Sequence, residues 1–206
     1  MRRYLKPRCP ILYVDDSSDD HSLLQAAATR TQTPLLIQPF FSADPAIAYL
    51  KGEPPFGDVT VYPRPHLVLC DYNLGATNGS ALVAAIREAS PCAHLPIIMF
   101  SGFGGNETVI NSYGAGADYF LCKPFAPSRL DALVRTLYAC ATSEPPNFRA
   151  LLRLPEHKPH SLTTLSSFLA QPPHRLSAHP QADSDRFTER HFKTPRKASQ
   201  IASQRR

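Results

Sequence analysis

The stretch LVLCDYNL, residues 67–74, decides the fold that we expect for this chain. Four apolar residues run without a break from Leu67 to Cys70, and Asp71 follows them directly. A continuous apolar run is typical of a parallel β-strand that is buried on both faces. In open parallel sheets, functional side chains collect at the carboxyl ends of the strands. The stretch therefore predicts a central strand with Asp71 at its functional end.

Similar apolar runs and helical patterns alternate along the chain on both sides of this stretch. The other runs are ILYV (11–14), LLI (35–37), IIMF (97–100) and YFLC (119–122). Helical patterns cover residues 17–30, 45–50, 80–89, 107–113 and 128–140, and Ser128 is the expected N-terminal cap of the last one. Five strands alternating with five helices predict right-handed crossovers and an α/β fold with a doubly wound parallel sheet.

The alternating pattern ends near residue 142. Residues 143–206 contain eight prolines, and 11 Lys/Arg against 5 Asp/Glu, so they carry the basic excess of the chain. We expect a folded domain over residues 8–142 and a disordered basic, Pro/Ser/His-rich tail over residues 143–206, with no recognised output domain. Within the tail, residues 161–171 place apolar side chains on one side and are a candidate docking segment. Residues 52–65 hold four prolines and predict a rigid loop that is a candidate contact surface.

The composition argues against several classes of protein. The five cysteines are odd in number and form no C-x-x-C pair, so neither a disulfide framework nor a zinc site is expected. No apolar stretch approaches the roughly 18 residues that cross a membrane. The N-terminus does not match a signal peptide, because its apolar run is short and ends in two aspartates. These features predict a cytoplasmic protein with no membrane partner.

Polar groups end four of the predicted strands. Asp15 and Asp16 follow the first strand, Asp71 the third, Ser101 the fourth and Lys123 the fifth. Two carboxylates 4 Å apart repel by about 4 kcal/mol at an effective dielectric constant near 20, so three in one pocket favour a bound divalent cation. An all-oxygen ligand set suits Mg²⁺ and leaves room for a phosphate. Lys123 would supply a positive charge for that phosphate, and Ser101 a hydroxyl donor.

Five short motifs together resemble the receiver domain of two-component response regulators. They are VDD (14–16), LCDYNL (69–74), Gly79, FSG (100–102) and CKPF (122–125). The resemblance covers residues 8–142 and implies a flavodoxin-like (βα)5 fold with strand order 2-1-3-4-5. The long connection at residues 52–65 also resembles that of single-domain regulators that are partners of phytochrome-type histidine kinases.

The resemblance implies a role for each acidic residue of the site. Asp71 would be the nucleophile that accepts a phosphoryl group. Asp16 and Asp71 would bind Mg²⁺ directly, Asp15 would bind it mainly through water, and Asn73 would contribute its main-chain carbonyl. Gly75 stands where the family often has proline, so we expect a more mobile loop after the acceptor.

The remaining motif residues would hold the phosphoryl group and transmit its presence. Ser101 would donate a hydrogen bond to a phosphoryl oxygen. Lys123 would pair with the phosphoryl group, and this lysine tends to precede a cis proline, here Pro124. Phe120 matches an aromatic switch position that turns inward as Ser101 moves. Gly102 replaces the usual alanine and still leaves room for the phosphoryl group.

The function implied is phosphorelay signalling by a non-enzymatic domain that only phosphorylates and dephosphorylates itself. Its partners would be a sensor histidine kinase or a phosphotransfer protein and a downstream protein target, and a homodimer is compatible with the resemblance.

Three other interpretations fit parts of the sequence. A regulator that contacts DNA through the basic tail is the alternative function, although nucleic acid is disfavoured because no aromatic platform or helix-turn-helix accompanies the basic end. A haloacid-type phosphatase would need an aspartate where this chain has Asn73. Asp19 and Asp20 are interpreted as solvated acids in the first turn of a helix.

Overall fold

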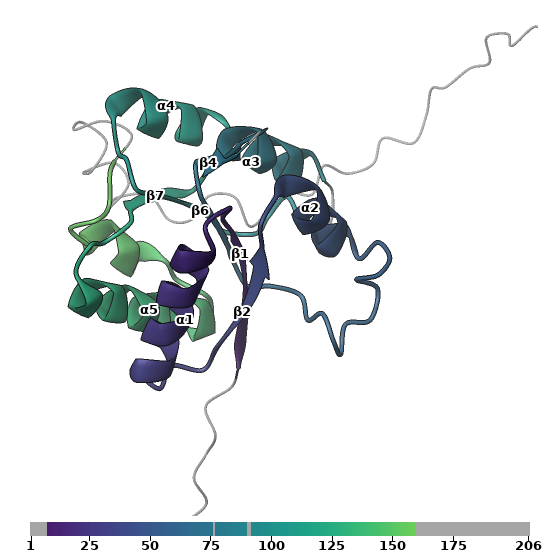
Figure 1. The fold of residues 1–206 in the computed structure, drawn as a ribbon, viewed down its shortest axis with the longest axis horizontal. Helices are drawn as coiled ribbons and strands as arrows, with labels where there is room; N and C mark the ends of the chain where they lie inside the picture. Colours follow the sequence, from purple (N-terminus) through teal and green to yellow (C-terminus); the bar gives the residue numbers. More distant parts are fainter. Residues whose placement is uncertain (1–7, 76, 90–91, 160–206) are drawn as a thin grey trace, which may run out of the picture. The chain divides into compact units, whose positions relative to one another are not determined.

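A five-stranded parallel sheet forms the centre of the described domain (Figure 1). The computed structural model describes residues 8–75, 77–89 and 92–159. In spatial order the strands are β2 (Leu35–Phe40), β1 (Cys9–Val14), β3 (Val68–Cys70), β6 (Ile97–Ser101) and β7 (Tyr119–Cys122). Each neighbouring pair is parallel. Counted along the chain this order is 2-1-3-4-5, so the predicted fold and strand order are confirmed.

Helices cover both faces of the sheet, α1 and α5 on one face and the other three on the opposite face (Figure 1). They are α1 (Ser18–Arg30), α2 (Ala43–Lys51), α3 (Gly79–Glu88), α4 (Asn106–Gly114) and α5 (Pro127–Thr142). Each face has its own apolar cluster. Two two-residue strands, β4 (Asn73–Leu74) and β5 (Thr77–Asn78), form a small antiparallel hairpin that begins two residues after Asp71.

Capping side chains hold the start of two of the five described helices, α1 and α3, and one predicted cap is wrong. The Ser17 side chain accepts a hydrogen bond from the Asp20 amide and caps α1. Ser128 does not cap α5: the cap position is Ala126, which makes no side-chain capping bond, and Pro127 is the first helical residue. Proline favours this position because its fixed φ suits a helix and its missing N–H would have no partner there.

Packed structure continues beyond the predicted domain end at residue 142. We call residues 148–158 the C-terminal segment; it contains the short 3₁₀ helix η1 (Arg149–Arg153). Phe148 and Leu151 are buried in the apolar cluster beneath α5. The prediction of disorder from residue 143 onward is therefore wrong for this segment, whose apolar side chains find a surface that no local pattern reveals. The candidate docking segment 161–171 lies outside the described residues.

The C-terminal segment also covers the open edge of the sheet along β7. His157 forms an antiparallel bridge with Leu121. The Cys122 amide donates to the Glu156 carbonyl over 2.8 Å, and the Lys158 amide donates to the Phe120 carbonyl over 2.9 Å. An exposed edge strand presents unpaired backbone groups, and the segment satisfies part of that edge.

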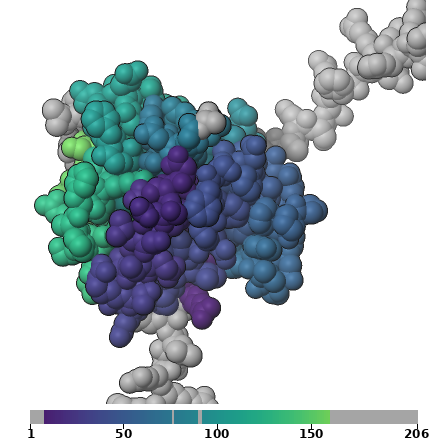
Figure 2. Space-filling view, viewed as in Figure 1, coloured from purple at the N-terminus to yellow at the C-terminus, as the bar shows by residue number. Residues whose placement is uncertain are grey.

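The connection between α2 and β3 has no regular secondary structure, as predicted, and stands at one side of the body (Figure 2). Phe56 and Tyr62 pack edge-to-face against Tyr49 of α2 and against each other. Val59 and Val61 are exposed. Aromatic packing thus holds the base of the connection, while its role as a contact surface stays a prediction.

No helix in the described part of the chain is both long and apolar enough to cross a membrane.

Candidate functional site

Three carboxylates meet at the carboxyl end of the sheet. Asp15 and Asp16 follow β1, and Asp71 follows the neighbouring strand β3. One oxygen from each lies within 4.8 Å of the others. Asp15 and Asp71 are buried and Asp16 is exposed. The predicted convergence of the three side chains is confirmed, and it follows from parallel pairing, which brings the ends of adjacent strands to one edge.

Lys123 crosses from β7 to these carboxylates. Its Nζ donates to Asp15 Oδ2 over 2.7 Å and lies 3.3 Å from Asp71 Oδ2. It also donates to Asp20 Oδ2 over 2.6 Å. Burial alone would lower the pKa of Lys123, but the hydrogen bonds to Asp15 and Asp20 together with the negative charges of Asp71 and Asp15 outweigh it, and the pKa is raised. The ammonium is therefore a fixed positive charge in the pocket.

Asp71 is held where it can act as a nucleophile. The Tyr72 amide donates to Asp71 Oδ1 over 2.7 Å, and the other carboxylate oxygen, Oδ2, lies near Lys123. Burial raises the pKa of Asp71 to about 6; Lys123 opposes this shift and Asp15 adds to it. At neutral pH the carboxylate is still mostly ionised, as a nucleophile must be.

The other predicted site residues lie at the same edge of the sheet. Ser101 is buried, and its Oγ accepts a hydrogen bond from the Phe103 amide over 3.3 Å. Its carbonyl accepts from the Lys123 amide over 2.8 Å, which ties the ends of β6 and β7 together. Phe120 is fully buried among the side chains beneath α4. A Cβ on Gly102 would meet nothing within 4 Å, so the loop has room there.

One predicted detail of the loops is wrong, and the greater mobility expected after Gly75 stays a prediction. The described residues contain cis peptides at Pro54-Pro55 and Glu144-Pro145 only, so the Lys123–Pro124 bond is trans and the prediction of a cis Pro124 is wrong. Trans is the intrinsically favoured isomer of an X–Pro bond. Gly75 has φ +63°, a left-handed conformation that proline cannot adopt, which explains the departure from the family pattern. Asn73 is exposed in β4.

Sequence reasoning missed two residues that shape the pocket. Asp20 is paired with Lys123, so its interpretation as a solvated acid is wrong. It lies in the first turn of α1, which begins two residues after Asp16, and this closeness to the acidic pair was the available signal. The Tyr13 hydroxyl donates to Asp15 Oδ2 over 2.5 Å. Tyr13 lies in β1 two residues before Asp15, and the alternation of extended backbone places both side chains on one face.

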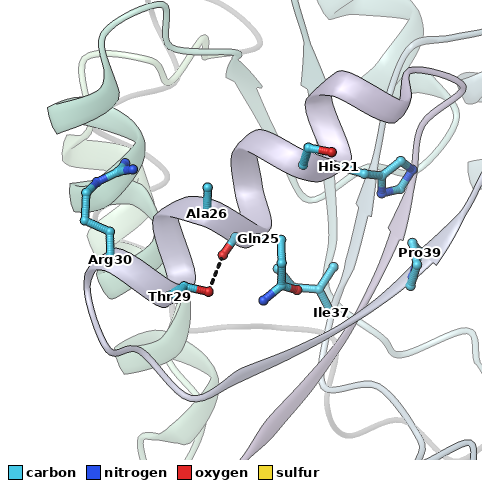
Figure 3. Close-up of a pocket in the computed structure, with 8 residues that line it drawn as sticks. His21, Gln25, Ala26, Thr29, Arg30, Ile37 and Pro39 are labelled. Carbon is cyan, nitrogen blue, oxygen red and sulfur yellow. Dashed lines mark hydrogen bonds between the residues drawn. The ribbon is translucent and has the colours of Figure 1, made fainter.

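His21 connects the site to a groove beside α1. Its Nε2 donates to the Asp15 carbonyl over 2.9 Å, because a carbonyl can only accept. Among the described residues its Nδ1 has no hydrogen-bond partner. Figure 3 shows this side chain at one end of a groove between α1 and β2, of about 670 Å³, whose other walls include Gln25, Ile37 and Pro39. The groove therefore lies next to the acidic pocket but outside it.

The donor set of the pocket fits a hard divalent cation. The acidic residues in contact with Lys123 are Asp15, Asp20 and Asp71, and Asp16 adds a further carboxylate beside them. Asp16 makes no hydrogen bond or ion pair with any described residue, so its oxygens are free to bind a metal. One ammonium does not balance these charges, and Mg²⁺ prefers carboxylate and water oxygens.

The fold and this edge of the sheet define a receiver domain. The sequence profile of the response regulator receiver domain matches residues 11–135. The chain therefore belongs to the response regulator receiver family, the signalling domain of two-component systems. Response regulators interact with histidine kinases or phosphotransfer proteins, and receiver domains bind Mg²⁺ at an acidic pocket.

Characterised relatives agree with this family. The chain is 27% identical over 134 residues to a chemotaxis protein CheY homolog of Campylobacter jejuni. The aligned region covers 65% of this chain and 95% of the relative. It is 35% identical over 75 residues to response regulator Rre1 of Synechocystis, covering 36% of this chain and 32% of Rre1. The match therefore spans nearly the whole CheY homolog but only about a third of Rre1.

Solved structures show the same fold. The crystal structure of the phosphorylated cyanobacterial phytochrome response regulator RcpA superposes with a TM-score of 0.59 at 23% identity and covers 67% of this chain and 96% of RcpA. The Mn²⁺-bound form of response regulator Rcp1 superposes with a TM-score of 0.54 at 24% identity and covers 65% of this chain and 93% of Rcp1.

Proposed function

We propose that this chain accepts a phosphoryl group on Asp71 and signals through protein–protein contacts of its receiver domain. The observation that carries the proposal is the ammonium of Lys123, 2.7 Å from Asp15 and 3.3 Å from Asp71 in a pocket of converging carboxylates. A buried carboxylate beside a fixed cation and a divalent-metal donor set is suited to phosphoryl transfer, where catalysis is mostly positioning and charge stabilisation.

In the proposed reaction an Asp71 oxygen attacks phosphorus in line with the leaving group. With a phosphohistidine donor, the P–N bond breaks as the O–P bond forms, and the imidazole nitrogen keeps the electron pair. Lys123 and the Ser101 hydroxyl would stabilise the phosphoryl oxygens. Mg²⁺ held by Asp15, Asp16, Asp71 and the Asn73 carbonyl would supply positive charge for the transferring group.

The signal would leave through the surface around α4, β7 and α5. The acyl phosphate places a dianion in a confined pocket, and Ser101 and Lys123 would be drawn toward it. Because the Lys123 amide is bonded to the Ser101 carbonyl, the two residues would move together. We propose that Phe120 follows this movement and that the altered surface binds the downstream partner.

Labelling with acetyl phosphate and Mg²⁺ tests the acceptor. We expect phosphorylation of the wild-type chain and none of Asp71→Asn, detected by intact mass spectrometry. Asp44→Asn, which changes an exposed acid of α2, is the matched control and should label normally. Undiminished labelling of Asp71→Asn would contradict the assignment.

A second function, contact with DNA through the basic tail, rests on the excess of 11 Lys/Arg over 5 Asp/Glu in residues 143–206. A mobility-shift assay that compares the full chain with a chain ending at residue 159 tests this DNA-contacting function. Salt-sensitive binding that disappears with the tail would support the DNA-contacting function.

A further inference from the structure

The ammonium of Lys123 has three carboxylate partners. Asp20 Oδ2 lies 2.6 Å from Nζ, Asp15 Oδ2 lies 2.7 Å away and Asp71 Oδ2 lies 3.3 Å away. An ammonium carries three N–H donors. Hydrogen bonds to Asp15 and Asp20 occupy two of these donors, and the third faces Asp71 at the longer distance of an ion pair. A phosphoryl group on Asp71 that draws the ammonium toward it therefore competes with the two shorter partners.

The three partners differ in how firmly they are held. Asp15 is fully buried and also accepts hydrogen bonds from the Tyr13 hydroxyl and the Ser17 amide. Asp71 would carry the phosphoryl group itself. The Asp20 side chain comes from the first turn of α1, is 31% exposed and makes no other hydrogen bond among the described residues. The Asp20 side chain can rotate into the solvent at the least cost, so Asp20 is the exchangeable partner of Lys123.

Asp20 is also distinct from the candidate metal ligands. The carboxylates whose oxygens gather within 4.8 Å are Asp15, Asp16 and Asp71. Among the described residues, the Asp20 side chain pairs with Lys123 alone. Its effect on the pocket is therefore exerted through that lysine.

We propose that Asp20 is a positioning residue that competes with the incoming phosphoryl group for Lys123 and so limits the stability of the phosphorylated state. The proposal rests on the phosphoacceptor function of Asp71. Before phosphorylation Asp20 holds the ammonium at the α1 side of the pocket. On phosphorylation Lys123 exchanges Asp20 for a phosphoryl oxygen, and the Asp20 carboxylate is released to solvent. The start of α1 would thereby report the phosphorylation state.

Beryllofluoride, which mimics a phosphoryl group on a carboxylate, measures this competition at equilibrium with saturating Mg²⁺. We expect Asp20→Asn to lower its dissociation constant about fivefold, the equivalent of about 1 kcal/mol for a partly exposed ion pair. With acetyl phosphate, the KM should fall by a similar factor while the maximal labelling rate changes little. Asp20→Glu restores the carboxylate and should return both constants toward wild-type values.

Asp19→Asn is the matched control, because it removes the same charge from an exposed neighbour that does not contact Lys123. Two results would overturn the proposed competition while leaving the acceptor function standing. One is equal beryllofluoride dissociation constants for Asp20→Asn and Asp19→Asn, and the other is weaker beryllofluoride binding by Asp20→Asn than by the wild-type chain. A wild-type chain that neither labels nor binds beryllofluoride would overturn the acceptor function, and the competition with it.

Discussion

Asp71 is ionised at neutral pH although its surroundings disfavour the charge. Burial raises its pKa to about 6 from 3.8, against the attraction of Lys123. The folded chain therefore binds a proton at Asp71 more tightly than the unfolded chain does, and this group makes folding less favourable as pH rises from about 4 through 6. The charge of the proposed acceptor Asp71 thus lowers stability, and an uncharged side chain would remove this cost.

Asp71→Asn should stabilise the metal-free chain above pH 6. We expect the unfolding free energy to rise by about 1 kcal/mol at pH 8, a value discounted for the partial solvation of the pocket. Lys123 loses little by the substitution, because it keeps Asp15 and Asp20 as partners. The gain should vanish below about pH 4, where Asp71 is protonated in both states. Urea unfolding in EDTA at several pH values measures it. A variant less stable than wild type at pH 8 would contradict the prediction, and the exposed Asp44→Asn should show no such pH dependence.

Gly79 lets α3 begin directly against the backbone that follows β3. A Cβ there would lie 2.0 Å from the Asp71 carbonyl oxygen and 3.0 Å from the Tyr72 Cα, both backbone atoms. We expect Gly79→Ala to cost about 1–3 kcal/mol of unfolding free energy through overpacking, although alanine usually favours a helix. Gly102→Ala, which meets nothing within 4 Å, is the control and should change stability by less than about 0.5 kcal/mol. Equal urea midpoints for the two variants would refute the clash.

At the scale of the elements, the C-terminal segment is the main addition to a receiver body. Its 3₁₀ helix buries Leu151 completely beneath α5, and its last residues bond to the edge of β7. The Lys158 amide bonds to the carbonyl of Phe120, the predicted switch residue. The segment therefore stabilises the same edge through which we propose that the signal leaves.

Leu151→Ala should destabilise the chain strongly. Deleting a fully buried leucine side chain typically costs about 2–5 kcal/mol through lost burial and a cavity. Leu152→Ala, a neighbouring leucine that is only half-buried, is the matched control and should cost less than half as much. Chemical denaturation of both variants measures the difference. If the two costs were equal, the segment would not be part of the cooperative core.

At the scale of the whole molecule, two apolar clusters on opposite faces of one sheet hold α1 and α5 on one side and α2, α3 and α4 on the other (Figure 1). The Arg30–Asp131 ion pair joins α1 to α5 at the surface. Because the carboxylates come from different strands, the pocket exists only in the folded chain. Metal binding is thus linked to folding of the whole domain.

Mg²⁺ should stabilise the folded chain by mass action. When the free Mg²⁺ concentration is tenfold above the dissociation constant, one bound ion adds about 1.4 kcal/mol to the unfolding free energy. We expect Asp16→Asn to lose most of this gain and the exposed Asp19→Asn to keep it. Thermal unfolding over a Mg²⁺ titration provides the measurement. A gain of the same size in Asp16→Asn would remove that residue from the ligand set.

The sequence by itself determined the strands, the alternation and the residues that end each strand. These features depend on local apolar runs and on parallel pairing, which brings strand ends to one edge, so Asp15, Asp16, Asp71, Ser101 and Lys123 could be predicted together. The tertiary structure alone decided the partners of individual side chains. Asp20 meets Lys123 across 103 residues of sequence, and the C-terminal segment packs beneath α5 by contacts that no local periodicity encodes. Such pairings depend on how separate elements are oriented in space, and the competition that we propose at Lys123 is visible only at that level.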